Sequence, residues 1–200
     1  MDSAGRPRRS GLFALTAAFC LLFLLLGCAG CGGSGAGLPG GGGEGSGAGP
    51  GREIPLQTLD QGISSEYGRF DEMPIPEDSP PECLVLSDEE EYQRLVSLAF
   101  FPQTPAEVDF SRYVVIAAMQ GPKSTGGYAI SIMYASQAGT EVRVELEVVE
   151  PEPGSMTVQM LTSPYHLVLA ERSSFDPRGE LVFTFFDQDD HRISQQPAEL

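Results

Sequence analysis

The side chains best suited to metal chemistry stand near the C-terminus, where His191 follows Asp187, Asp189 and Asp190. Carboxylates and an imidazole this close together are ligands that a divalent cation accepts. The same run of acids is also typical of a solvated turn after a strand. We favour the turn and predict no metal site here.

The other histidine, His166, lies between Tyr165 and Leu167, among strand-forming residues. We expect its imidazole to be held by hydrogen bonds at a sheet edge and not to act as a catalytic base. The chain contains no HExxH, GxSxG or P-loop motif and no CxxC-associated zinc pattern. No nucleophile, base and orienting group can be named together. The sequence therefore predicts no catalytic residue, no cofactor and no enzymatic activity.

The N-terminal segment predicts export. Three arginines precede the apolar run GLFALTAAFCLLFLLL, which has the length of a signal-peptide core and is short for a membrane-spanning helix. The run ends in LLGC, which resembles the lipobox of bacterial lipoproteins. That resemblance implies a signal peptide over residues 1–27, lipidation of Cys28 and a location in the cell envelope, outside the cytoplasm. Cleavage before Cys31, an uncleaved anchor and an ordinary secretory signal are the alternatives.

Glycine dominates the next stretch, and residues 28–52 are predicted to form a flexible tether because they cannot bury enough apolar surface to fold. Two or three acyl chains on Cys28 would hold the protein on the bacterial membrane, since each buried methylene contributes about 0.8 kcal/mol. The whole chain carries a net charge of -16; removing a signal with three arginines and one aspartate leaves -18. This charge argues against nucleic acid as a partner.

From residue 53 onward the composition becomes globular, and we expect a single domain over residues 53–200. Cys83 is the one cysteine of this domain, so a disulfide framework within it is excluded. A bridge between Cys83 and Cys31 in the tether stays open, because sequence alone does not show their geometry.

Hydrophobic patterning in this domain predicts many strands and one helix. The helix lies in SDEEEYQRLVSLAF, where Ser87 and Glu90 have the spacing of a capping box. Apolar or alternating runs predict strands at residues 54–59, 83–86, 113–119, 128–134, 140–150, 165–170 and 181–186. The expected fold class is mainly β, a β-rich α+β fold. It would be an antiparallel sheet, a sandwich or an open barrel with one helix on the N-terminal side.

Two stretches, EVDFSRYVVIAAMQGPKSTGGYAISI and LTSPYHLVLAER, resemble the C-terminal domain of the protease-complex subunit PrcB family. The shared features are an apolar strand, a glycine-to-TGGY corner and an SPYH step into a later strand. The resemblance covers residues 108–172. It implies a small lipoprotein-borne module that associates with a protease at the cell surface and stabilises it.

The glycine-rich corner and the SPYH step are the candidate partner-binding site. Glycine backbones expose amide groups, and tyrosines bury a large area at little entropy cost. We expect the two segments to lie together, with Lys123 as a positive charge on an acidic surface. The predicted contacts are Lys123, Ser124, Thr125, Gly126, Gly127, Tyr128, Ser163, Pro164, Tyr165 and His166.

Two other interpretations of the corner stay open. It can be a tight turn between strands, pinned by Tyr128. KSTGGY also faintly resembles a loop of chagasin-type cysteine-protease inhibitors. This second interpretation makes the protein an inhibitor, although the chain has no tryptophan for the inhibitors' second loop.

Overall fold

The computed structural model describes residues 51–68, 75–101 and 107–200. The predicted signal peptide, Cys28 and the tether up to residue 50 lie outside these ranges. Within them, no helix has the length and apolar character needed to cross a membrane.

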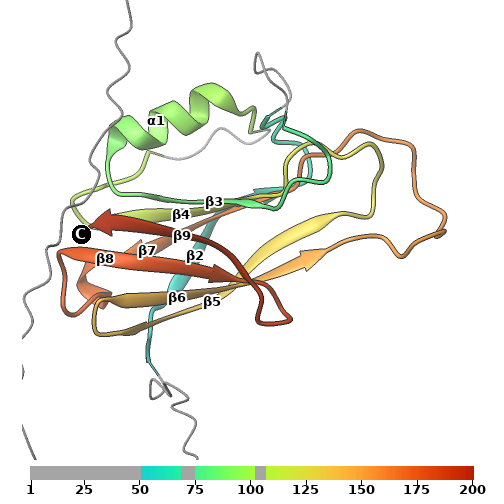
Figure 1. The fold of residues 1–200 in the computed structure, drawn as a ribbon. Coiled ribbons are helices and arrows are strands. Elements are labelled where there is room, and N and C mark those ends of the chain that lie inside the picture. Colours follow the sequence, from blue (N-terminus) through green and yellow to red (C-terminus); the bar gives the residue numbers. More distant parts are fainter. Residues whose placement is uncertain (1–50, 69–74, 102–106) are drawn as a thin grey trace, which may run out of the picture. The chain divides into compact units, whose positions relative to one another are not determined.

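The described residues form two packed sheets and one α-helix (Figure 1). The first sheet has the order β1-β5-β6-β8-β9, and the second has the order β2-β7-β4-β3. All pairs of neighbouring strands are antiparallel except β6 and β8, which are parallel. The prediction of a β-rich fold is confirmed, in the form of a sandwich. The strands are β1 (Arg52–Glu53), β2 (Leu56–Gly62), β3 (Glu82–Leu86), β4 (Tyr113–Met119), β5 (Ala129–Ala138), β6 (Glu141–Val149), β7 (Tyr165–Glu171), β8 (Glu180–Phe186) and β9 (Arg192–Glu199).

Strand β4 is buried on both faces, which explains its unbroken apolar sequence YVVIAAM. One set of its side chains packs between the two sheets: Val114, Ile116 and Ala118. The alternate set packs toward the helix: Val115, Ala117 and Met119. Helix α1 (Glu89–Leu98) lies over this outer face (Figure 1). It covers the face because Tyr92 and Leu95 form its apolar stripe.

The helix begins one residue later than the capping-box spacing predicted. Asp88 is the N-cap, and its carboxylate accepts the backbone N–H of Glu91 at 2.8 Å. The Glu91 carboxylate in turn accepts the backbone N–H of Ser87 at 2.8 Å. The predicted pair of Ser87 and Glu90 is therefore wrong. Ser87 and Asp88 can each cap a helix, and the sequence did not show which of the two does so.

Three strands differ from their predictions. The strand predicted at residues 128–134 is β5, which continues to Ala138. The first strand was predicted at residues 54–59, but the structure has β2 at Leu56–Gly62. In addition, Arg52 at the end of the predicted tether pairs with Gln137 of β5. Strand β9 was not predicted, because RISQQPAE is polar and contains Pro197. The proline is tolerated because β9 is an edge strand that pairs with β8 alone.

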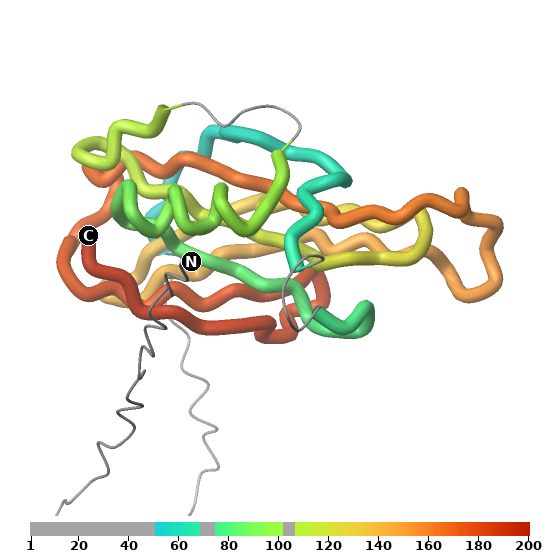
Figure 2. The backbone as a smooth tube through the Cα atoms, turned by 90° about the horizontal axis from the view of Figure 1, so that it is seen from above, coloured from blue at the N-terminus to red at the C-terminus, as the bar shows by residue number. Residues whose placement is uncertain are grey.

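Two connections leave the same end of the sandwich and extend together, and we call them the arm. They are residues 120–128, between β4 and β5, and residues 150–164, between β6 and β7. Both reach beyond the two sheets in Figure 1 and in the view from above in Figure 2, where they are the yellow and orange segments. The arm contains eight of the ten predicted contact residues, and the other two, Tyr165 and His166, begin β7.

Candidate functional site

Backbone hydrogen bonds join the two connections of the arm. The N–H of Lys123 donates to the carbonyl of Thr162 at 2.7 Å, and the N–H of Thr162 donates back at 2.9 Å. The Thr162 hydroxyl donates to the carbonyl of Thr125 at 2.9 Å. Farther out, the N–H of Gly126 donates to the carbonyl of Val158 at 2.8 Å. The structure therefore brings the KSTGGY and SPYH segments together, as the sequence led us to expect.

Lys123 is not the exposed charge that we expected, because only 4% of the residue is accessible to solvent. Its ammonium group donates to the backbone carbonyl of Glu77 and lies 5.3 Å from the centre of the Tyr128 ring. The Glu77 carboxylate accepts the backbone N–H and the hydroxyl of Ser124, at 3.0 and 2.8 Å. These hydrogen bonds, the backbone one first, lower the pKa of Glu77. Lys123 therefore fixes the base of the arm to residues 76–78.

The SPYH segment is buried and serves as support. The Ser163 hydroxyl lies 2.9 Å from that of Ser65. The Tyr165 hydroxyl donates to the buried Asp60 carboxylate at 3.0 Å, and its ring packs edge-on against Phe101. Burial, followed by the hydrogen bond to Asp60, raises the pKa of Tyr165. These side chains hold the end of β7 in place beneath the arm.

His166 is hydrogen-bonded as predicted, although its strand lies inside the sheet and not at an edge. Its Nδ1 accepts the backbone N–H of Ile132 at 2.8 Å. The remaining ring proton is therefore on Nε2, which lies 3.0 Å from the Thr58 hydroxyl. Burial lowers the pKa of His166, so the neutral ring is favoured. The imidazole links the two sheets, since Ile132 belongs to β5.

A partner can reach only part of the predicted set. Ser124 and Gly127 are exposed, and Thr125 and Tyr128 are half-buried. Gly127 has a φ of +96°, which a side chain would strain, so the glycine is needed to shape the corner. A pocket of about 300 Å³ lies at the base of the arm and is lined by Ser64, Glu66, Ile75, Glu77, Pro122, Lys123, Ser124, Leu161, Thr162 and Ser163.

The most exposed apolar side chains of the arm were missed by the sequence analysis. They follow the β6 exit in the segment PEPGSMTVQML, where Met156, Val158 and Met160 alternate with two polar residues. This short alternation was not interpreted, and a second signal is the absence of charge across residues 153–163. The exposed side chains are Met156, Val158, Met160 and Leu161.

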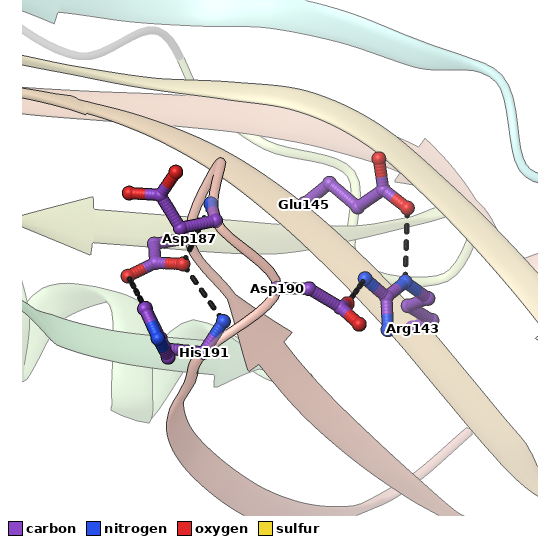
Figure 3. A network of polar contacts seen from close by, with 6 residues as sticks. Arg143, Glu145, Asp187, Asp190 and His191 are labelled. Carbon is purple, nitrogen blue, oxygen red and sulfur yellow. Dashed lines mark hydrogen bonds and ion pairs between the residues drawn. The ribbon is translucent and has the colours of Figure 1, made fainter.

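The turn between β8 and β9 contains the group first considered for metal chemistry (Figure 3). Ligand atoms of Asp187, Asp189 and His191 lie within 4.8 Å of one another. The Asp187 carboxylate accepts the backbone N–H of His191 at 2.8 Å and that of Asp189 at 2.9 Å, and these bonds lower its pKa. Asp190 instead pairs with Arg143. The carboxylate of Asp187 thus caps the turn.

A comparison with known protein families agrees with the resemblance found in the sequence. Residues 114–169 match the family model described as PrcB C-terminal, so that prediction is confirmed for this segment. The matched segment begins in β4, ends in β7 and includes the whole arm. Neither the curated proteins nor the solved structures contain a significant match to the chain.

Proposed function

We propose that this protein is an accessory or stabilising subunit of an extracytoplasmic protease, held at the bacterial membrane by a lipid on Cys28. It acts by binding its partner and not by catalysis. The observation that carries the proposal is the PrcB C-terminal match, which covers four strands and the arm between them. A module of this family is named for a protease complex, which makes a protease the expected partner.

The placement of the histidines supports a binding role. Both ring nitrogens of His166 are engaged with groups of this chain, and burial favours its neutral form. A general base needs a nitrogen that reaches the proton it removes. His191 lies in the turn between β8 and β9, and its Nδ1 is 3.3 Å from the Asp187 carboxylate. The role of each imidazole is explained by the fold itself.

The attachment of the tether is compatible with a module displayed toward a partner. Arg52, next to the predicted tether, pairs with Gln137 at one end of β5, whereas the arm joins the other end at Ala129. Eight residues of extended strand separate these positions, which corresponds to about 26 Å. The arm therefore lies at the end of β5 opposite to Arg52, the residue that the predicted tether leads to.

Purification of the tagged full-length protein from a detergent extract of its native envelope tests the proposal. We expect a protease to copurify in stoichiometric amount and to keep its activity longer when the protein is present. The Cys28→Ser variant should lose the lipid and leave the membrane fraction. Absence of a protease would contradict the proposal, and inhibition of an added cysteine protease by the purified protein would favour the inhibitor instead.

A further inference from the structure

The outer part of the arm presents apolar side chains to solvent. Met156 and Val158 have relative exposures of 102% and 70%, and Leu161 and Met160 follow with 60% and 44%. Residues 153–163 carry no charged side chain, although the chain has a net charge of -16. Exposed apolar clusters of this kind mark interaction sites, and methionine is enriched in the charge-depleted centres of protein interfaces.

Hydrogen bonds fix the backbone beneath these side chains at Val158 and at Thr162. The carbonyl of Val158 accepts the N–H of Gly126 at 2.8 Å and that of Met160 at 3.0 Å. At the base, Lys123 and Thr162 exchange two further backbone bonds. A preorganised segment loses less entropy on binding than a free loop, so the apolar cluster is ready to make contacts.

We infer that the arm is a docking element whose apolar tip, Met156 and Val158 with Met160 and Leu161, inserts into an apolar groove with a basic rim on a protein partner. The identity of that partner as a protease rests on the proposed function. The groove must be apolar because the four side chains offer no ionic group and gain from leaving water. Methionine side chains also adapt to irregular apolar surfaces.

The basic rim follows from three exposed acids on or beside the arm, which we call the acidic collar. Glu150 and Glu152 lie on the arm itself, and Glu77 is bound to Ser124 at its base. The one cation of the arm, Lys123, is buried and cannot contact a partner directly. Positive groups around the partner's groove would complement this acidic collar and speed association.

The same charges disfavour other binding partners for the apolar tip. An anionic membrane surface repels the collar, and the arm lies at the opposite end of β5 from the tether's point of attachment. A second copy of the chain would bring two acidic collars together. An apolar groove with positive charges on a protein partner is the surface that complements both the apolar tip and the acidic collar.

Site-specific photocrosslinking in the full-length, membrane-bound protein tests the inference. A photoreactive amino acid replaces Met156 on the arm or, as a control, Met133. Met133 is also an exposed methionine, at 61%, but it lies on β5 beside Arg143 and Glu145. We expect efficient crosslinks from position 156 to one protein and few from position 133.

The dissociation constant of the purified complex is then measured for Val158→Asp, Met156→Asp and the control Met133→Asp. We expect each arm variant to weaken binding at least tenfold and the control to leave it within twofold. The affinity of the unmodified protein should fall as salt is raised, since the collar and rim attract each other. All three side chains are exposed, so the variants should melt at the temperature of the parent.

The outcomes separate the two proposals. Crosslinks from position 156 to a protease, weakened by Val158→Asp, support both. Crosslinks from position 156 to a different protein, with the same effect of Val158→Asp, support the docking arm and overturn the protease assignment. A protease crosslinked only from position 133, or bound equally by the arm variants, overturns the docking arm alone. Crosslinks from position 156 to lipid, to a second copy or to nothing also overturn it.

Discussion

The side-chain amide of Gln196 on β9 binds both backbone groups of Val85 on β3. The N–H of Val85 donates to Oε1 of Gln196 at 3.0 Å, and Nε2 of Gln196 donates to the Val85 carbonyl at 3.2 Å. The two strands are edges of different sheets, so one amide imitates a neighbouring strand and joins the sandwich on this side. It also satisfies the outward N–H and carbonyl of Val85 on the edge of β3, where another chain could otherwise pair.

Replacing Gln196 by alanine should lower the free energy of unfolding by about 1 to 3 kcal/mol, because two part-buried backbone groups lose their partner. Urea denaturation of the parent and the variant measures this difference. The control is Gln195→Ala, whose side chain is exposed and should change stability by less than about 0.5 kcal/mol. Equal effects of the two substitutions would show that the Gln196 amide contributes nothing specific.

The His166 imidazole should make stability depend on pH. Its pKa is lowered in the folded state, so the unfolded chain binds the additional proton once the pH falls below about 6.5. Stability is therefore complete above that pH and declines below it, by at most about 1.4 kcal/mol per pH unit, until the folded-state pKa is reached. Protonation also removes the acceptor that Nδ1 offers to Ile132.

Denaturant melts between pH 7.5 and 5 measure this decline. The His166→Gln variant should be less stable at pH 7.5 but should show a much flatter profile over this range. The carboxylates whose pKa values are lowered, such as Glu171, are ordinarily titrated at more acidic pH and do not account for a decline that begins near 6.5. Parallel profiles for parent and variant would exclude His166 as the source.

The two glycines of the corner should respond differently to alanine. Gly127 has a φ of +96°, and an added Cβ would lie 3.3 Å from the Cβ of Pro151. Gly127→Ala should therefore cost about 1 to 3 kcal/mol in unfolding free energy. An added Cβ at Gly126 meets nothing closer than 3.6 Å, so Gly126→Ala should be nearly neutral. Thermal melts of the two variants provide the comparison. A Gly127→Ala variant that melts like the parent would show that the positive φ does not require glycine.

Lys123 should contribute to the stability of the folded protein, although the sequence led us to expect an exposed side chain. Lys123→Met keeps the apolar stem but loses the hydrogen bond to the Glu77 carbonyl and the contact with the Tyr128 ring. We expect a loss of about 1 to 2 kcal/mol in unfolding free energy. Thr125→Ala is the matched control, because the Thr162 hydroxyl binds the backbone of Thr125 and not its side chain. A variant at Lys123 that melts like the parent would mean that the buried ammonium adds no net stability.

Sequence patterns predicted the elements that are strongly amphipathic or wholly apolar. Strand β6 shows this well, since Val142, Val144 and Leu146 alternate with polar residues and are all buried. Strand β9 escaped prediction because its place is fixed by pairing with β8 and by the Gln196 amide, which are long-range contacts. Neither of these contacts can be inferred from the sequence pattern of β9 alone.

The candidate site was predictable only in outline. The glycines and the short motifs located the corner, and the resemblance placed it in a PrcB-like module. The burial of Lys123 could not be foreseen, because its partner Glu77 is 46 residues away in the chain. The exposure of Met156 was equally hidden, since an apolar residue in a sequence is normally expected to be inside.

The rate at which the copurified protease loses activity on heating tests the central proposal most directly. The protease is incubated alone, with an equimolar amount of the full-length protein, and with its Val158→Asp variant, and the remaining activity is followed over time. We predict slower inactivation with the parent protein and little protection by the variant. An inactivation rate that is the same with and without the parent protein would contradict its role as a stabilising subunit.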